Sequence, residues 1–525
     1  MKSYMDCLDE ITGDELYEGL LGYGMFAEKL PPVFSSKAFY DYCVANPSAF
    51  NKKVEKGYIY FESMRNTNIP RPLGIPTPMK YAVLCGELRD NWDDIRDVFR
   101  NNTSGDPYKV SRLHIRKRSA DKALLEVGYG ETEDEPHDYD QIPNIPECDS
   151  EETSLFCMNY KNWVVDGDPI LDFSLGKKYV VKADISQCFP SIYTHAITWA
   201  IVGKAAAKAN RSGKWYNKID SACQKMRNGE THGLLIGPHA SNLISELLLT
   251  TVDKALRGKG YDYIRNIDDY TCYTKTHEEA ERFLIDLNIE LRAFDFSINH
   301  KKTVIEELPQ LSSEYWIQKL KDKPIIGRYD VVDFNTARSY IDTAVSLMQT
   351  NGGNASSLFY AIKILGNNPI SNSAKDFCVK TMCNLAIIYP YLVPIMDQFV
   401  FDAFNASVFD IEAFAKVLYE DSTRNANFEG ISYSLFYAIK YNFCITLDTA
   451  NIIQSTSCIC KLMMLLYARK YGDLATETLL LDEARRLKAT EFDENWIFIY
   501  EALTALELDD EWKNLKNAGV SFLDV

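Results

Sequence analysis

The sequence lacks a long uninterrupted apolar run, which excludes an ordinary membrane-spanning helix. Its longest apolar stretch, residues 381–396, contains Asn384, Pro390 and Pro394, so it is too short and too broken to cross a bilayer. We expect a buried helix there instead. No basic segment followed by an apolar one opens the chain, so no secretory signal is expected.

The cysteine spacing of a disulfide framework or a zinc site is also missing. The 13 cysteines are scattered, and Cys458 and Cys460 do not have the spacing of a zinc ligand pair. This usage fits reduced, mostly buried thiols in a cytoplasmic protein.

Positive charge is scarce, because 57 Lys and Arg face 74 Asp and Glu and the net charge is −17. Such a balance argues against a tight, salt-sensitive grip on a long duplex. Residues 131–152 alone hold ten acidic residues and no Lys or Arg. The rest of residues 1–309 is therefore close to neutral and can be locally basic.

Residues 266–270 (Asn-Ile-Asp-Asp-Tyr) are the most informative stretch of the chain. Their flanks are rich in tyrosine and favour β-structure, so we expect a tight hairpin with Asp268 and Asp269 at its tip. Adjacent carboxylates repel each other, and a fold that presents them together usually neutralises them with a divalent cation. An ordinary surface turn is the alternative.

A third carboxylate, Asp184, ends a β-branched segment at 179–184. A strand that brings Asp184 beside the hairpin would create a site for two Mg²⁺ ions roughly 3.5–4 Å apart, as used in phosphoryl transfer. From spacing alone, a strand-end Asp that pairs with Lys182 or caps the next helix is an equally good interpretation.

Four segments, in order, resemble the catalytic motifs of reverse transcriptases. They are Asp184 with Phe189 five residues on, the Gly-rich turn and helix start at 233–244, residues 265–269, and residues 297–303. The resemblance implies an N-terminal segment and fingers at 1–178, an α+β palm at 179–309, and DNA synthesis from deoxynucleotides (dNTPs) with Mg²⁺.

Three further stretches resemble the abortive-infection reverse transcriptases of bacteria, and among them the type carried by P2-like prophages. They are residues 25–34, 70–76 and 189–204. Members of that group are known for antiphage defence, for DNA synthesis without a template from a protein hydroxyl, and for closed homo-oligomers. The resemblance therefore implies a single-stranded DNA product attached covalently to the protein.

The resemblance also assigns roles to the carboxylates and their neighbours. Asp184 and Asp268 would bind the metal ions with support from Asp269, and the backbone carbonyl of Ile185 would complete the shell of one ion. Lys302 would protonate or stabilise the departing pyrophosphate; a solvated lysine is the alternative.

Other residues are expected around the nucleotide. Phe189 would lie beneath the sugar and exclude a 2′-hydroxyl, unless it is a plain core residue. Gly237 and Ser241 would shape the pocket by close backbone approach. Arg112, in the basic cluster 111–118, would contact phosphates, although a solvated basic strand explains this cluster equally well.

Departures from the family pattern bear on how synthesis would start. Asn266 stands where many reverse transcriptases have Tyr or Phe. Ile236 stands where template-copying relatives have Gln, which puts templated copying in doubt. Tyr23, in a Gly-Tyr-Gly setting, resembles the priming tyrosine of abortive-infection enzymes; a packing role for its ring is the alternative.

Residues 310–525 show helical periodicity and no convincing strands. The segment 357–363 (Ser-Leu-Phe-Tyr-Ala-Ile-Lys) recurs identically at 434–440, an offset of 77, which is close to two units of a HEAT-type repeat. The expected fold class is therefore α+β reverse-transcriptase fingers and palm followed by an all-α HEAT-like helical repeat domain. Nothing here resembles a duplex-gripping thumb.

Three functions remain in order of preference. The first is protein-primed, template-independent DNA synthesis for antiphage defence. The second is templated copying of RNA, which the replaced Gln and the missing thumb disfavour. The third is a non-catalytic scaffold that binds a phage or host protein through the helical domain, which the retention of all three Asp residues disfavours.

Overall fold

The β-branched segment at 179–184 forms the strand on which the palm is built. The computed structural model describes residues 4–47, 50, 57–104, 111, 113–117, 156–160, 169–311, 314–325 and 331–524. Within it, β5 (Tyr179–Asp184) lies inside a four-stranded sheet of order β6-β7-β5-β8. All three pairings of this sheet are antiparallel, as the α+β prediction for the palm requires.

The predicted hairpin is β6 (Asp262–Asn266) followed by β7 (Asp269–Thr274), and β8 (Val304–Glu307) pairs with the other edge of β5. Helix α14 (His277–Ala293) packs on β5 and β7 through a buried apolar stripe. The remaining palm helices are α8 (Pro169–Ser174), α9 (Cys188–Ser191), α10 (Thr194–Val202), α11 (Lys204–Ala209), α12 (Trp215–Met226) and α13 (His239–Gly258).

The N-terminal region consists of helices and two small antiparallel sheets. Its most extended feature is the hairpin of β1 (Tyr58–Met64) and β2 (Pro70–Pro76), in which β2 is proline-rich, as an edge strand can be. The other elements are α1 (Tyr4–Asp9), α2 (Gly13–Leu21), α3 (Lys37–Ala45), α4 (Pro78–Asp90), α5 (Trp92–Asn102), β3 (Leu113–Lys117) and β4 (Phe156–Tyr160).

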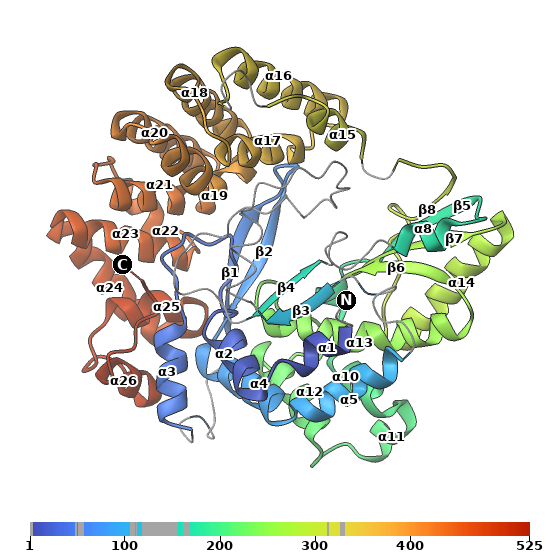
Figure 1. Ribbon diagram of the computed structural model, residues 1–525. Coiled ribbons are helices and arrows are strands. Elements are labelled where there is room, and N and C mark those ends of the chain that lie inside the picture. The colour runs from blue at the N-terminus through green and yellow to red at the C-terminus, as the bar shows by residue number, and fades with distance from the viewer. Residues whose placement is uncertain are drawn as a thin grey trace.

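After the palm, the named elements of the described chain are all helices, and these helices form an arc beside the β1–β2 hairpin (Figure 1). They are α15 (Tyr315–Lys321), α16 (Phe334–Thr350), α17 (Ser356–Gly366), α18 (Asn372–Ile388), η2 (Pro390–Leu392), α19 (Val393–Met396), η3 (Asp397–Asp402), α20 (Val408–Arg424), α21 (Phe428–Tyr441), α22 (Thr449–Gln454), α23 (Cys458–Tyr471), α24 (Leu474–Thr490), α25 (Phe492–Ala502) and α26 (Asp510–Asn517).

One helix prediction is wrong. The apolar stretch 381–396 is not a single helix, because it covers the end of α18, the 3₁₀ turn η2 and the short helix α19. Pro390 causes the break, since a proline disfavours helical geometry at the residue before it. Among the described residues, no helix is both long and apolar enough to cross a bilayer.

The two copies of the seven-residue repeat lie in α17 and α21 and pack against the same element, the π-helix η3. Lys440 of the second copy forms ion pairs with Asp397 (2.8 Å) and Asp402 (2.9 Å). Lys363 of the first copy lies over the ring of Phe399, 5.1 Å from its centroid. The lysine that ends each copy therefore contacts η3, although through different partners.

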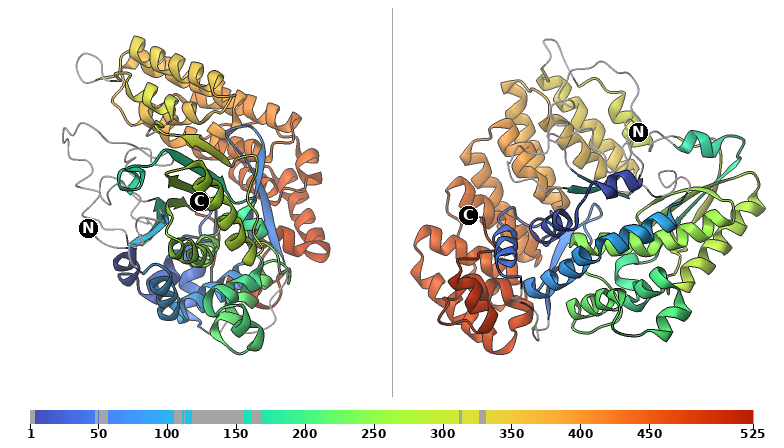
Figure 2. Two further views of the ribbon diagram at one scale, coloured as in Figure 1. Left: turned by 90° about the vertical axis from the view of Figure 1, so that its right-hand side faces the viewer. Right: turned by 60° about the horizontal axis from the view of Figure 1, so that its bottom comes forward.

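The helical arc is fixed to the N-terminal region at several points along its length, and the left view in Figure 2 shows the hairpin lying beside the orange and red helices. Near the turn of the hairpin, Ala355 N donates to Asn66 O (3.0 Å). At the end of the chain, Ser35 N donates to Phe522 O (3.0 Å). These contacts join segments more than 280 residues apart.

Glu429 of α21 makes the most buried of these contacts. Its carboxylate is 1% exposed and accepts hydrogen bonds from Ser63 Oγ and Met64 N, both 2.7 Å away. Burial raises the pKa of Glu429 to about 7, and the two hydrogen bonds and nearby Lys29 only partly oppose this rise. The folded protein therefore binds a proton at Glu429 more tightly than the unfolded chain does.

This raised pKa predicts a pH-dependent contribution to stability. The contribution is fully present below the unfolded value of 4.5 and is lost as the pH rises to about 7. We expect the unfolding free energy of wild type, relative to Glu429→Gln, to fall by roughly 2 kcal/mol between pH 5 and pH 8. Urea titrations at each pH measure the free energy of unfolding, and Glu420→Gln, at an exposed position, is the control. A difference that does not change with pH would show that Glu429 is ionised throughout.

Candidate active site

The catalytic carboxylates meet because β5 and β7 pair in a fixed register. Asp184 and Asp269 are direct cross-strand partners. Asp268 lies in the two-residue turn between β6 and β7, next to Ile267, whose φ of 53° is the left-handed geometry of a tight hairpin turn. Ile185 N donates to Asp268 O (3.1 Å), which ties the end of β5 to this turn. The three Asp residues therefore lie at the same end of the sheet.

The segment 297–303 closes the other side of Asp184. Asn299 N donates to Asp184 O (2.8 Å), and the following turn directs Lys302 back onto the Asp184 carboxylate, with which it forms an ion pair. Lys182, the alternative partner considered from the sequence, pairs with Glu306 instead (2.9 Å). Lys182 and Asp184 share one face of β5, because they are two residues apart, but Lys182 pairs across the sheet with Glu306 of the neighbouring strand β8.

The electrostatics around Asp268 are those of crowded carboxylates with nearby cations. Burial and the Asp184 carboxylate raise the pKa of Asp268, while Lys302 and Arg71 partly oppose the rise. The hydrogen bond to Asp184 raises the pKa of Lys302, so its ammonium group stays protonated. The site therefore concentrates negative charge and has cations at its edge.

Arg265 is a residue whose role the sequence did not reveal. Its side chain is fully buried and forms ion pairs with Glu246 (2.9 Å) and Asp253 (2.6 Å) of α13, which are also buried. It also donates to Ile267 O (2.8 Å) in the turn itself. Burial alone would lower the pKa of Arg265, but Asp253 and Glu246 raise it well above its usual value. Arg265 thus fixes the catalytic turn to α13.

The loop of the second motif is held between the first motif and the N-terminal region. Leu234 N donates to Phe189 O (2.9 Å), and Gly74 N of β2 donates to Ile236 O (2.7 Å). Gly237 has a φ of 126°, and a Cβ there would lie 3.2 Å from Ala27 Cβ, so both the backbone geometry and the space favour glycine. Ser241 is buried in α13, and Phe189 is half-buried.

The segment that carries Tyr23 lies against the same loop. His239 N, at the start of α13, donates to Gly24 O (2.8 Å), and a Cβ on Gly24 would lie 2.7 Å from His239 Cβ. Tyr81 Oη also donates to Gly24 O (2.8 Å). Tyr23 itself is half-buried.

Arg71 of β2 is a second residue that received no role from the sequence. Its side chain is exposed, and its charge acts on Asp268. A cation beside the carboxylates is suited to a nucleotide's phosphates. Arg112, which was predicted for this role, lies outside the described residues, as does the acidic segment 131–152.

The donor set suits a hard divalent cation, because Asp184, Asp268 and Asp269 supply carboxylate oxygens at one end of the sheet. Within the described ranges, however, no three His, Cys, Asp or Glu side chains are grouped closely enough to hold an ion. Lys302 takes the place of a cation on Asp184. The carboxylates therefore fit Mg²⁺ chemically, and a bound ion would compete with Lys302.

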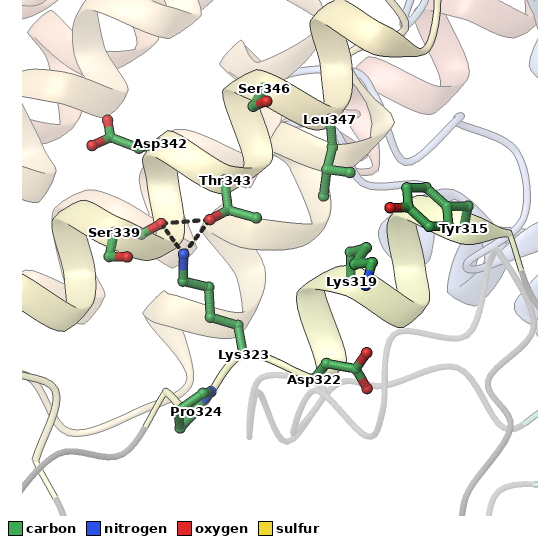
Figure 3. Close-up of a pocket in the computed structure, with 10 residues that line it drawn as sticks. All are labelled: Tyr315, Lys319, Asp322, Lys323, Pro324, Ser339, Asp342, Thr343, Ser346 and Leu347. Atoms are coloured by element: carbon green, nitrogen blue, oxygen red, sulfur yellow. Dashed lines mark hydrogen bonds between the residues drawn. The ribbon is translucent and has the colours of Figure 1, made fainter.

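A separate hollow of about 560 Å³ lies between α15 and α16 (Figure 3). Lys323 reaches across it and donates to Ser339 O (2.9 Å) and to the Thr343 hydroxyl. All of its lining residues belong to α15, α16 or the chain between them. The lysine therefore serves to join these two helices, and the palm carboxylates lie elsewhere.

Comparison with known sequences decides the family of the palm. Residues 136–324 match the family Reverse transcriptase (RNA-dependent DNA polymerase). The chain contains a reverse transcriptase domain. This domain is accordingly of the RNA-directed DNA polymerase type. A search of curated proteins found no match.

Solved structures similar to this chain include fungal telomerases, all of them distant. Apo telomerase from Candida tropicalis, truncated from the C-terminal domain, is 14% identical with a TM-score of 0.26, over 53% of this chain and 57% of that one. Apo telomerase from Candida tropicalis is 10% identical (TM-score 0.30; 76% and 73% covered). Telomerase from Candida albicans in complex with a TWJ fragment of telomeric RNA is 10% identical (TM-score 0.28; 80% and 64% covered). Likenesses this distant carry no information about function.

The buried network predicts a large effect of Arg265→Met on stability. The variant leaves Glu246 and Asp253 buried without their cation, which costs about 3–5 kcal/mol. Urea unfolding measures this loss, and Arg282→Met on the exposed side of α14 should stay within about 0.5 kcal/mol of wild type. Adding Glu246→Gln and Asp253→Asn should recover part of the stability. An Arg265→Met protein as stable as wild type would contradict the proposed anchor.

Proposed function

We propose that this reverse transcriptase is a protein-primed polymerase of the abortive-infection type, which adds dNTPs without a template and serves antiphage defence. Its product would be a single-stranded DNA attached to the protein, made in the cytoplasm by a homo-oligomer. The observation that carries the proposal is the contact between the N-terminal Tyr23–Gly24 segment and the second-motif loop, since a protein primer must reach its own nucleotide site.

The chemistry would follow from the carboxylates at the end of β5 and in the β6–β7 turn. Mg²⁺ ions, when bound, lower the pKa of an attacking hydroxyl and stabilise the leaving pyrophosphate. Asp184 and Asp268 would hold them, with Asp269 and the Ile185 carbonyl in support. Lys302, kept protonated by Asp184, would supply a proton or positive charge to the pyrophosphate.

The remaining site residues would position the nucleotide. Arg71 would bind its phosphates, and Phe189, linked to the second-motif loop by the bond from Leu234 N, would lie under the sugar. Gly237 and Ser241 would let the backbone approach the nucleotide. Ile236 has no side-chain amide with which to contact a templating base, and this supports synthesis without a template.

In this scheme the helical arc has a structural role. Its α17 and α21 repeats, which we assign to the HEAT-like class, hold the β1–β2 hairpin through Asn66 and Glu429. That hairpin carries Arg71 and contacts the second-motif loop through Gly74. An arc attached in this way would stabilise the fingers side of the site rather than grip a duplex.

The proposal predicts that the protein labels itself. Purified protein incubated with a labelled dNTP and Mg²⁺, without added nucleic acid, should carry label on a denaturing gel. Asp268→Asn should reduce the label about 100-fold or more, because the metal site supplies several kcal/mol of transition-state stabilisation. Asp262→Asn, at a carboxylate of the same sheet that pairs with Lys177, is the matched control. Label only on free strands that depend on an added RNA would instead identify a templated enzyme.

The primer assignment makes a narrower prediction. Tyr23→Phe removes one hydroxyl and keeps the ring, so covalent labelling should be lost while folding is retained. Tyr40→Phe, on the neighbouring helix α3, should label like wild type. Mass spectrometry of the labelled peptide should find the nucleotide on Tyr23. A labelled Tyr23→Phe protein would exclude this residue as the primer and leave the metal site unaffected.

A further inference from the structure

A basic surface of this acidic protein lies on the α11–α12 protrusion, residues 204–227. These residues contain seven Lys or Arg and a single acidic residue, Asp220, in a chain with a net charge of −17. Figure 1 shows α11 at the lower edge of the molecule, next to α10 and α12. Gly203 and Gly213, with φ of 81° and 82°, bound α11 and allow the chain to reverse there.

The charges of the protrusion are exposed and largely unneutralised, namely those of Lys204, Lys208, Arg211, Lys214 and Lys225. No carboxylate of the described residues lies within ion-pair distance of any of these five. Asp220 is buried and bonded to His195 Nδ1 (2.6 Å), so it faces inward. Like charges held together repel each other, and a polyanion would relieve this repulsion.

A row of aromatic side chains connects the second-motif loop to this protrusion. His232, which precedes Gly233, stacks on Tyr193 with ring centroids 4.9 Å apart. Tyr193 contacts Trp199 (5.4 Å), and Lys204 Nζ lies 4.1 Å above the Trp199 ring. The row begins at a loop of the active site and ends at the first lysine of the protrusion.

We infer that this row and the α11–α12 protrusion form a binding track for single-stranded nucleic acid. Cations that follow a backbone, interleaved with aromatic faces on which bases stack, are the physical basis of such tracks. A duplex has no free base faces on which the rings could stack. Binding to an anionic membrane would make no use of the aromatic rings. The choice of DNA as the strand rests on the proposed function, since the strand made at the carboxylates would leave past His232.

Fluorescence anisotropy with a labelled 20-nucleotide dT oligomer tests the track in the Asp268→Asn protein, without dNTPs. The patch variant Lys208→Glu/Arg211→Glu/Lys214→Glu should bind at least about tenfold more weakly. The slope of log Kd against the logarithm of the salt concentration should fall by about 2, because each lost phosphate contact of a single strand contributes about 0.7. The control Lys375→Glu/Lys470→Glu/Lys513→Glu makes the same change in net charge on the helical arc and should bind like the parent.

A second variant separates stacking from charge. Trp199→Leu should weaken binding of the dT oligomer about tenfold. It should leave binding of heparin, a polyanion without bases, unchanged. A duplex of equal length should bind more weakly than the single strand. Equal losses of affinity in the patch and control variants would overturn the inference. A Trp199→Leu protein with unchanged affinity for the oligomer would also overturn it. Because these assays involve no synthesis, the track can stand if self-labelling fails, and self-labelling can stand if the track fails.

Discussion

The buried ion pairs of Arg265 are the interaction on which the geometry of the active site depends. Removing one cation and two carboxylates from water is costly, and such a cluster is retained only where its geometry is well satisfied. Here the guanidinium bonds Glu246, Asp253 and the Ile267 carbonyl at 2.6–3.1 Å. The turn that carries Asp268 is thereby fixed to the long helix α13, whose first residues belong to the second motif. One side chain thus sets the position of two catalytic motifs.

The same constraint extends outward through the backbone. The second-motif loop is bonded to the first motif, to β2 and to the N-terminal segment, and the helical arc in turn contacts the turn of the β1–β2 hairpin and the strand β1. Displacements of about 1 Å can cost an enzyme two orders of magnitude in rate. The distant helices therefore matter to chemistry through the rigidity that they give to the fingers side of the site.

Much of the catalytic centre could be predicted from sequence because its signals are local. The β6–β7 hairpin and the strand that ends at Asp184 follow from short patterns, and residues 297–303 resemble a family motif. The helical nature of residues 310–525 followed from periodicity, although the break at Pro390 was missed because the apolar content continues across it. Assignment of that region to the HEAT-like class stays a prediction.

What could not be predicted depends on contacts far apart in the chain. Glu246 and Asp253 look like ordinary polar positions of an amphipathic helix, and only the fold reveals that they face Arg265. Likewise, no local pattern links Glu429 with Ser63 or Arg71 with Asp268. Lys182 was a reasonable partner for Asp184, because the two residues share a face of β5, but it pairs with Glu306 of the neighbouring strand, and Asp184 pairs with Lys302.

The central claim is that Asp184 and Asp268 act together on divalent cations, and Mn²⁺ binding followed by electron paramagnetic resonance tests it most directly. With a non-hydrolysable dNTP present, the wild-type chain should bind two Mn²⁺ ions at the palm. Asp184→Asn and Asp268→Asn should each lose at least one of them, and Asp262→Asn should lose none. Mn²⁺ binding that is unchanged in both Asp184→Asn and Asp268→Asn would contradict the account.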